Sequence, residues 1–150
     1  MPAFWLMKSE PETYSWQRLC EEGQTLWEGV RNHQAKNNLK AMKVGDIGLF
    51  YHSVSDKSIV GLCRVVQEHY PDPTAVEELP EGKPNPWVVV NVVPLASLPS
   101  PITLATIKAT PALEAMALLK QSRLSVAPVT AEEFELLCGM GQLDPTPYLR

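Results

Sequence analysis

The stretch from Trp27 to Ser53 constrains the fold of this chain more than any other part of it. It runs from an aromatic residue through a dense polar and basic tract, residues 31–43, into an apolar segment, residues 47–53. One face of the tract carries apolar residues at the i, i+4, i+7 spacing of a helix, namely Ala35, Leu39 and Met42. The sequence therefore predicts a helix with one packing face, followed at once by a buried strand.

Hydrophobic runs and capping residues predict the other elements. Strands are expected at residues 4–9, 47–53, 59–66 and 87–95, with a shorter extended segment at 122–128. Helices are expected at residues 16–22, 32–42, 104–108, 112–120 and 130–138. The segment 97–101 is expected to end the preceding strand, and Gly139 to end the last helix. Strands and helices do not alternate strictly, which is typical of an α+β fold: a small, mixed, curled sheet forming a barrel decorated with helices.

Length and composition exclude several classes of protein. A chain of 150 residues fits one domain. No stretch approaches the roughly 20 apolar residues of a membrane span, and the N-terminus lacks a basic leader, so we expect a cytoplasmic protein without membrane association.

The cysteines are expected to be buried and unpaired, and the histidines lack the spacing of metal ligands, so neither a metal nor a cofactor is expected. These residues are Cys20, Cys63, Cys138, His33, His52 and His69.

Charge is distributed unevenly along the chain. The net charge of −4 argues against non-specific binding of duplex DNA over a large surface. Between Arg31 and Lys43, however, there are four cations and no acid. Lys36, Lys40 and Lys43 follow one another at helical spacing. The pattern favours contact with a few phosphates rather than a broad electrostatic surface.

Four classes of function are conceivable for this sequence: catalysis, binding of a nucleotide phosphate, binding of a nucleic-acid base and protein docking. A catalytic pair of His52 and Ser53 is excluded, because adjacent strand residues point to opposite faces; a pairing of Ser53 with His33 or His69 has no sequence support. No glycine-rich phosphate loop is present, and no segment identifies a protein-docking surface. A pocket for a nucleic-acid base fits best, because Trp27 is followed by cations and amides. The residues leave a second interpretation open, in which Trp27 is a core anchor and the lysines form a solvated helix face.

Several motifs closely resemble those of the EVE domain family, and they extend over nearly the whole chain. They are the segments 4–11, 14–16, 27–39, 45–46, 50–53, 70–74 and 123–129. The resemblance implies a PUA-like barrel and a single EVE domain over residues 1–150, of a stand-alone bacterial type. It implies a non-enzymatic module that reads a modified nucleobase, with modified cytosine in DNA the leading candidate and RNA a further one. The alternatives are a PUA-like enzyme, such as a hydrolase acting on modified nucleosides or RNA, and a domain that binds a small metabolite or nucleotide.

The resemblance also implies a set of site residues. Those expected around the base are Lys8, Ser9, Glu10, Trp27, Arg31, Asn32, His52, Ser53, Leu124 and Ser125. Those expected at phosphates are Lys36, Lys40 and Lys43. One position departs from the related YTH domains, which hold a methylated adenine: Glu28 stands where they have a small polar residue. Because glutamate accepts from the amino group of cytosine, this departure favours a cytosine-like ligand.

Overall fold

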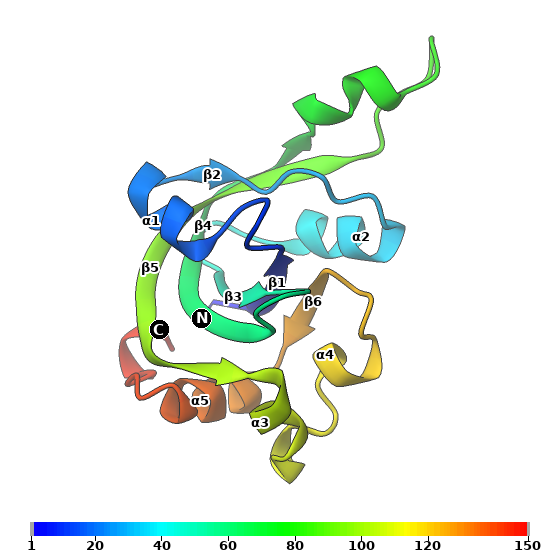
Figure 1. Cartoon of the computed structure of the whole chain (residues 1–150). Coiled ribbons are helices and arrows are strands. Elements are labelled where there is room, and N and C mark those ends of the chain that lie inside the picture. The colour runs from blue at the N-terminus through cyan, green and yellow to red at the C-terminus, as the bar shows by residue number, and fades with distance from the viewer. Residues whose placement is uncertain (1, 150) are drawn as a thin grey trace.

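The computed structural model describes residues 2–149, and its centre is a mixed sheet of six strands (Figure 1). The strands are β1 (Phe4–Ser9), β2 (Thr25–Leu26), β3 (Ile47–His52), β4 (Ser58–Pro71), β5 (Val88–Thr103) and β6 (Val126–Val129). Their order in the sheet is β2-β5-β4-β3-β1-β6. β1 and β3 are parallel, and the other neighbours are antiparallel. The predicted α+β class with a mixed sheet is confirmed.

Helices cover both ends of the sheet. α1 (Trp16–Glu22) and α2 (His33–Ala41) lie at one end, and α3 (Leu104–Lys108), α4 (Ala117–Lys120) and α5 (Ala131–Met140) at the other (Figure 1). Three short 3-10 helices complete the secondary structure: η1 (Pro73–Glu78), η2 (Pro111–Leu113) and η3 (Thr146–Tyr148). Ser15, Asn32 and Thr130 are the N-caps of α1, α2 and α5, and each accepts a hydrogen bond from the first turn of its helix.

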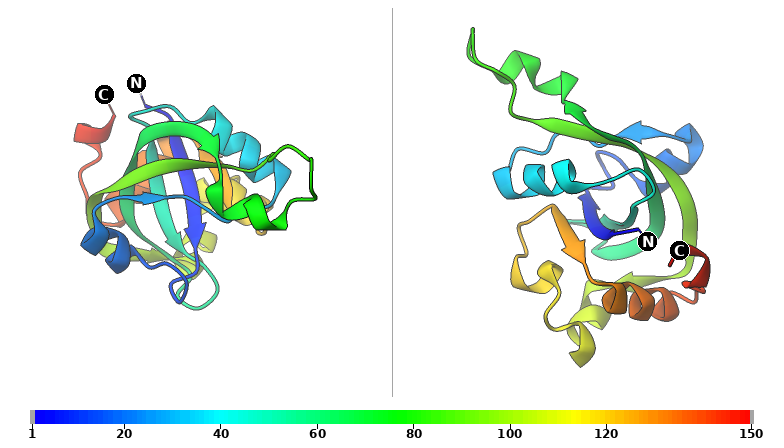
Figure 2. Two further views of the ribbon diagram at one scale, coloured as in Figure 1. Left: turned by 90° about the horizontal axis from the view of Figure 1, so that it is seen from above. Right: turned by 180° about the vertical axis from the view of Figure 1, so that it is seen from behind.

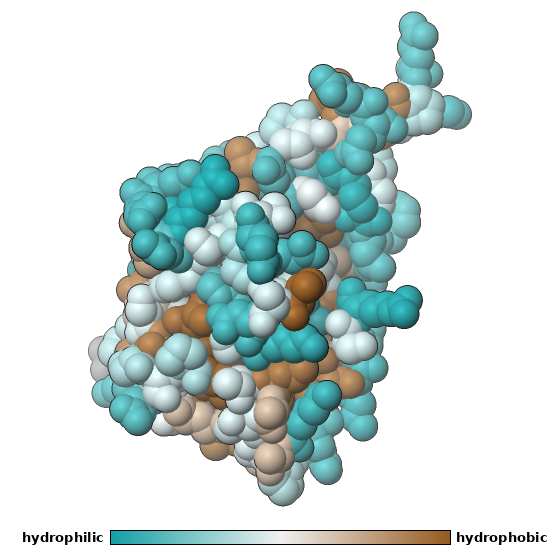
Figure 3. Space-filling model, viewed as in Figure 1, coloured by the Kyte–Doolittle hydropathy of each residue, from teal (hydrophilic) through white to brown (hydrophobic). Residues whose placement is uncertain are grey.

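The sheet curls strongly because its two longest strands bend. The pairing of β4 with β5 shifts register four times along its length, and such bulges bend a strand and increase its twist. Both strands wrap around the body in the two views of Figure 2. Residues 72–87, between β4 and β5, project from this body as an arm (Figures 1 and 2). The surface of the arm is largely hydrophilic, whereas hydrophobic residues gather lower on the same face (Figure 3).

A glycine determines where α1 sits on the sheet. A Cβ atom on Gly61 of β4 would lie 2.4 Å from the indole of Trp16, so only glycine allows this close approach. The Trp16 indole N–H donates to the hydroxyl of Ser97 at 2.9 Å, and its ring packs edge-on against Phe50, with 5.3 Å between centroids. α1 is therefore held in one position on the sheet.

Several predicted boundaries are wrong. The strand expected at residues 59–66 continues to Pro71 in β4. The segment 97–101 does not end the strand, and β5 continues to Thr103. Ile59 pairs with Ile102 and Gly61 with Ser97, so four residues of β5 bulge opposite one residue of β4; the prolines of this segment lie where few ladder hydrogen bonds are needed.

The predicted helix at 112–120 is divided into η2 and α4. Met116 is extended and buried between them, so the chain leaves the helical conformation to bring this side chain into the core. At the last helix, α5 continues past Gly139 to Met140.

The three cysteines do not share one environment. Cys63 and Cys138 are buried, as expected, and burial raises the pKa of each thiol to about 12. Cys20 is exposed instead. It lies on α1 one residue after Leu19, which is buried in the core. Because successive helix residues point about 100° apart, the position next to the buried one faces away from the core.

Candidate nucleic-acid interface

A cleft of about 310 Å³ opens where β1 ends, between α1 and the chain that leads from β2 to α2. Its volume lies at the lower end of the range of ligand sites in proteins. Ten residues line it: Lys8, Ser9, Thr13, Tyr14, Arg18, Glu22, Thr25, Leu26, Trp27 and Glu28. The sequence predicted three of them, Lys8, Ser9 and Trp27, as residues around the base.

Trp27 is both a core residue and part of the cleft wall. Its side chain is only 6% exposed and packs edge-on against Phe50, with 5.3 Å between ring centroids and 87° between the planes. Its backbone N–H donates to the carbonyl of Val90 at 2.8 Å. Trp27 is nevertheless among the residues that line the cleft. The two interpretations of this residue, core anchor and ligand wall, are therefore compatible.

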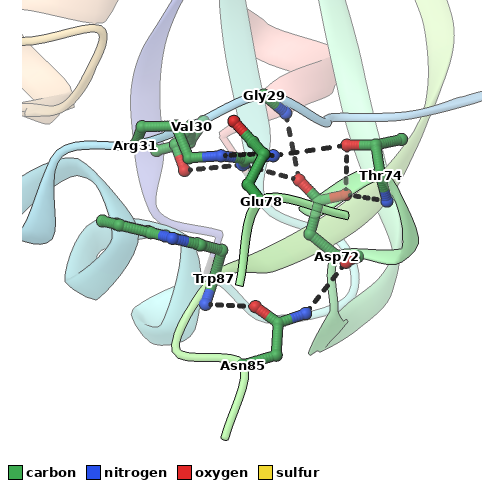
Figure 4. A network of polar contacts seen from close by, with 8 residues as sticks. All are labelled: Gly29, Val30, Arg31, Asp72, Thr74, Glu78, Asn85 and Trp87. Carbon is green, nitrogen blue, oxygen red and sulfur yellow. Dashed lines mark hydrogen bonds and ion pairs between the residues drawn. The ribbon is translucent and has the colours of Figure 1, made fainter. Parts of the chain in front are cut away.

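The buried carboxylate of Asp72 fixes the chain just after Trp27 (Figure 4). Its Oδ2 accepts from the backbone N–H of Gly29 at 3.1 Å and from Nη1 of Arg31 at 2.9 Å. Its Oδ1 accepts from the backbone N–H and the hydroxyl of Thr74, at 2.7 and 2.6 Å. Gly29 has a φ of 82°, which glycine adopts without strain. The base of the arm is thereby joined to one wall of the cleft.

These contacts also set the charge of Asp72. Burial disfavours the ionised carboxylate, but the hydrogen bonds from Thr74, Gly29 and Arg31 outweigh burial and hold the pKa of Asp72 below its ordinary value. The surrounding hydrogen-bond donors therefore stabilise the ionised form of Asp72.

Arg31 is occupied by the same network and does not line the cleft. Its Nε and Nη2 both donate to Oε2 of Glu78, at 2.9 and 2.6 Å, while Nη1 reaches Asp72. The guanidinium also lies 5.8 Å from the ring centroid of Trp87. Arg31, which was expected around the base, thus connects the wall of the cleft to the arm.

The exit of β1 forms the floor between the two walls. Lys8 Nζ donates to the carbonyl of Ser122 at 2.7 Å, and burial lowers the pKa of the Lys8 ammonium below its ordinary value. The Ser9 hydroxyl donates to the carbonyl of Tyr14 at 2.6 Å. Glu10 is exposed and does not line the cleft, but its carbonyl accepts from the N–H of Tyr14 at 2.8 Å. The predicted polar exit of the first strand therefore shapes the cleft through both side chains and backbone.

The second wall comes from α1 and the turn before it. The Tyr14 hydroxyl donates to Glu22 Oε1 at 2.7 Å, and Arg18 Nε donates to Glu22 Oε2 at 3.1 Å. The Arg18 guanidinium also lies 5.1 Å from the ring centroid of Tyr14. The two charges of α1 at the cleft are therefore paired with each other.

His52 and Ser53 support this wall from behind. The Nε2 atom of His52 accepts from the backbone N–H of Trp16 at 3.0 Å, so its Nδ1 carries the proton and donates to Asp56 at 2.8 Å. The backbone N–H of Ser53 donates to the carbonyl of Ser9 at 2.9 Å. Neither residue lines the cleft. Their contacts fix the start of α1 and the end of β1 relative to each other.

The remaining expected base contacts lie elsewhere. Asn32 and Leu124 line a second cleft of about 360 Å³. The Asn32 side chain also caps α2 by accepting from the N–H of Ala35 at 2.9 Å. The carbonyl of Ser125 accepts from the backbone N–H of Lys8 at 2.9 Å. The structure therefore separates the ten predicted base-pocket residues into one cleft, its supports and a neighbouring cleft.

The three lysines expected at phosphates lie outside both clefts. Lys36 is half-buried, with Nζ 3.1 Å from His33 Nδ1 and 6.0 Å from the ring centroid of Trp87. Lys40 is exposed in the last turn of α2. Lys43 is exposed beyond the end of this helix. Only the first two therefore belong to the helical ridge that the spacing predicted.

Sequence reasoning missed the part of the cleft that α1 supplies. Arg18 and Glu22 stand at i and i+4 on a predicted helix, a spacing that places both on one face. Tyr14 lies in a motif that was noted but not assigned to the site. Asp72 belongs to the family motif at residues 70–74 but was not assigned to the site, and no local pattern links it to Gly29 across 43 positions.

Among residues 2–149, no group of three or more histidine, cysteine, aspartate or glutamate side chains could hold a metal ion. No helix in the same range has the length and apolar character needed to cross a membrane.

Comparison with known proteins identifies the family. The EVE domain model matches residues 3–140. Human thymocyte nuclear protein 1 is 36% identical over 97% of this chain and 77% of its own length. The crystal structure of the human protein in complex with DNA containing 5-methylcytosine superposes with a TM-score of 0.88, at 35% identity, covering 95% of this chain and 99% of that one.

Bacterial structures are equally similar. Protein Atu2648 from Agrobacterium tumefaciens has a TM-score of 0.87 at 43% identity, and the match covers 94% of both chains. An ASCH protein from Zymomonas mobilis, at 12% identity and a TM-score of 0.56, shares the fold alone. The PUA-like fold is thus confirmed, and this chain belongs to the EVE domain family.

Proposed function

We propose that this protein is a non-enzymatic module that binds nucleic acid and reads a modified base, most simply a modified cytosine, in the cleft at the end of β1. The observation that carries the proposal is the convergence of Lys8, Trp27 and Glu28 on one cleft of ligand size. The human relative in complex with DNA containing 5-methylcytosine supports the same class of ligand. A base can enter such a cleft only after it has left the stack of neighbouring bases, so the cleft is expected to hold a single base.

The cleft offers planar apolar surface for the base. Trp27 and Tyr14 line it from different segments of the chain. Stacking of a base on an aromatic side chain contributes about 1–3 kcal/mol to binding. Both rings are held in place, Trp27 by Phe50 and Tyr14 by its hydrogen bond to Glu22. A fixed ring loses little entropy on binding, so the stacking energy is retained.

The polar groups of the cleft complement the edge of cytosine. Arg18 and Glu22 pair with each other, whereas Glu28 is exposed and takes part in none of the four ion pairs within residues 2–149. Lys8 donates to a carbonyl and is partly desolvated. Glu28 accepts from the exocyclic amino group of cytosine, and the Lys8 ammonium donates to the ring acceptors. A carboxylate at this position selects a base with an amino group.

Several side chains at the cleft that could act as catalysts are committed to structural contacts. His52, which contacts the start of α1, accepts the N–H of Trp16 through Nε2 and therefore lacks a lone pair for proton abstraction. Arg18 and Glu22 are paired. We accordingly infer binding rather than turnover, and incubation with modified nucleosides and oligonucleotides is expected to return them unchanged.

Glu28→Gln tests the base contact at constant shape. The variant is compared with the wild type on strands that differ in one base, namely cytosine, 5-methylcytosine, adenine and N6-methyladenine, at fixed salt. The wild type is expected to prefer the modified cytosine. Glu28→Gln is expected to weaken that binding about tenfold, because a hydrogen bond to a charged acceptor is replaced by one to a neutral amide.

Glu135→Gln is the matched control, since Glu135 is exposed on α5 at the other end of the sheet. It is expected to bind as the wild type does. Equal binding of all four strands by the wild type, or a preference for methylated adenine, would contradict the proposal.

A further inference from the structure

The second cleft adjoins the first at Lys8. Lys8 lines the first cleft, and Ser122 lines the second. The Nζ of Lys8 donates to the carbonyl of Ser122 at 2.7 Å. The backbone N–H of Lys8 also donates to the carbonyl of Ser125 in the same segment. The two clefts are therefore neighbouring parts of one surface, with an ammonium group between them.

The lining of the second cleft suits an anion. It consists of one guanidinium, three carboxamides, one hydroxyl and a leucine, and it contains no carboxylate: Asn32, Gln34, Gln121, Ser122, Arg123 and Leu124. Arg123 is exposed and takes part in none of the four ion pairs within residues 2–149. The absence of acid is notable in a chain with a net charge of −4. Guanidinium and amide groups match the acceptor oxygens of a phosphodiester.

The two sides of this cleft are held at a fixed separation. Asn32 and Gln34 belong to the start of α2, whereas residues 121–124 precede β6. The side-chain N–H of Asn38 on α2 donates at 2.7 Å to the carbonyl of Val126 on β6. α2 and β6 also pack directly against each other. A rigid cleft requires little reorganisation when a ligand enters.

We infer that the second cleft binds the sugar-phosphate backbone next to the base held in the first cleft. The strand passes over Lys8, and Arg123 grips the neighbouring phosphate while the carboxamides contact the same backbone. This inference rests on the proposed function, because the position of the base in the first cleft determines where the strand runs. The two clefts then have different roles: the first reads the base, and the second adds affinity that does not depend on sequence.

Arg123→Ala tests the division. The affinities are measured for a single strand with one 5-methylcytosine and for its unmodified counterpart, over a series of salt concentrations. Arg123→Ala is expected to weaken both strands by the same factor, roughly five- to tenfold, and to leave their ratio unchanged. The slope of log affinity against log salt is expected to become shallower by about 0.7, the value of one phosphate contact on a single strand. Glu28→Gln, by contrast, changes the ratio.

Two more variants complete the design. Gln34→Glu places a carboxylate in the second cleft at constant shape, and should weaken both strands alike. Because an acid in the first turn of a helix is favourable, this loss cannot be attributed to unfolding. Arg64→Ala is the matched control: Arg64 is an exposed arginine on β4 that lies level with Phe4, at the opposite end of β1 from Lys8. It should bind as the wild type does.

The outcomes separate the two proposals. If Arg123→Ala leaves both affinities and the salt slope unchanged, the second cleft has no role, whatever the first one reads. If Arg123→Ala alters the ratio of modified to unmodified binding, Arg123 acts on the base and the inference is overturned. If the wild type shows no preference for the modified strand, the base reading fails, and a shallower slope in Arg123→Ala still supports the backbone site.

Discussion

The chain from Trp27 to Lys43 consists of two halves that are held in different ways. The first half, Trp27 to Arg31, is attached to the protein by the core and by Asp72, and its first two residues line the first cleft. The second half is α2 with its following turn, where Lys40 and Lys43 are exposed. Substitutions in the first half should change stability and base selectivity together. Substitutions of the exposed lysines in the second should change only the electrostatic attraction of a strand.

Trp27→Ala should have the largest effect. Loss of a buried tryptophan lowers the free energy of unfolding by about 3–5 kcal/mol, and loss of the stacking surface weakens binding of the modified strand by about 1–3 kcal/mol. Unfolding in urea and strand binding at low temperature measure the two losses. Trp27→Phe preserves more of the core packing, and it replaces the alanine variant in both measurements if that variant does not fold.

Trp5 provides the matched control for that experiment. It is 7% exposed, close to the 6% of Trp27, and its indole N–H donates to Asp46 at 3.0 Å at the other end of β1. Trp5→Phe should lower stability by a similar amount and leave the base selectivity intact. If Trp5→Phe and Trp27→Phe reduce binding equally, the loss follows from stability alone and Trp27 has no separate role as a wall.

Asp72→Asn should have the next largest effect. It removes the charge that faces Arg31, so we expect a loss of about 2 kcal/mol at neutral pH, less than for a fully buried pair because Arg31 keeps Glu78. The pKa of Asp72 is lower in the folded protein than in the unfolded chain. Its contribution to stability is therefore complete above the unfolded value of about 4 and is lost as the pH falls through the folded value.

Unfolding measured over a pH series tests this sign. The difference in stability between the wild type and Asp72→Asn should shrink below about pH 4. Glu77→Gln, an exposed substitution in η1 next to Glu78, should follow the wild type throughout. A constant difference between the wild type and Asp72→Asn over the whole range would mean that the charge of Asp72 contributes nothing to the attachment of the arm.

The contrast between the two halves explains what the sequence could and could not predict. Helix caps such as Ser15 and Asn32 act within a few residues, so local patterns located α1 and α2 correctly. The contacts that decide the site act over long separations: Asp72 reaches Gly29 across 43 positions, and Lys8 reaches Ser122 across 114. Family resemblance supplied the residues near the site.

The family resemblance did not show which contacts each of these residues makes. Arg31 has the chemistry of a phosphate contact, yet its guanidinium is occupied by Asp72 and Glu78. Only the fold brings these acids to it. The same limit applied to Asn32 and Leu124, which were assigned to the base and lie in the neighbouring cleft.

Lys40→Ala should have the smallest effect of the three. Because Lys40 is exposed, its removal should leave the free energy of unfolding within about 0.5 kcal/mol of the wild type. If α2 attracts the strand, modified and unmodified strands should both bind about twofold more weakly, with a slightly shallower salt dependence. Lys108→Ala on α3, an exposed lysine at the other end of the sheet, is the control. A salt slope equal to that of the wild type would exclude Lys40 from strand binding. Lys40 would then belong to a solvated face of α2, and the contacts of this helix with a strand would be limited to its start, where Gln34 lines the second cleft.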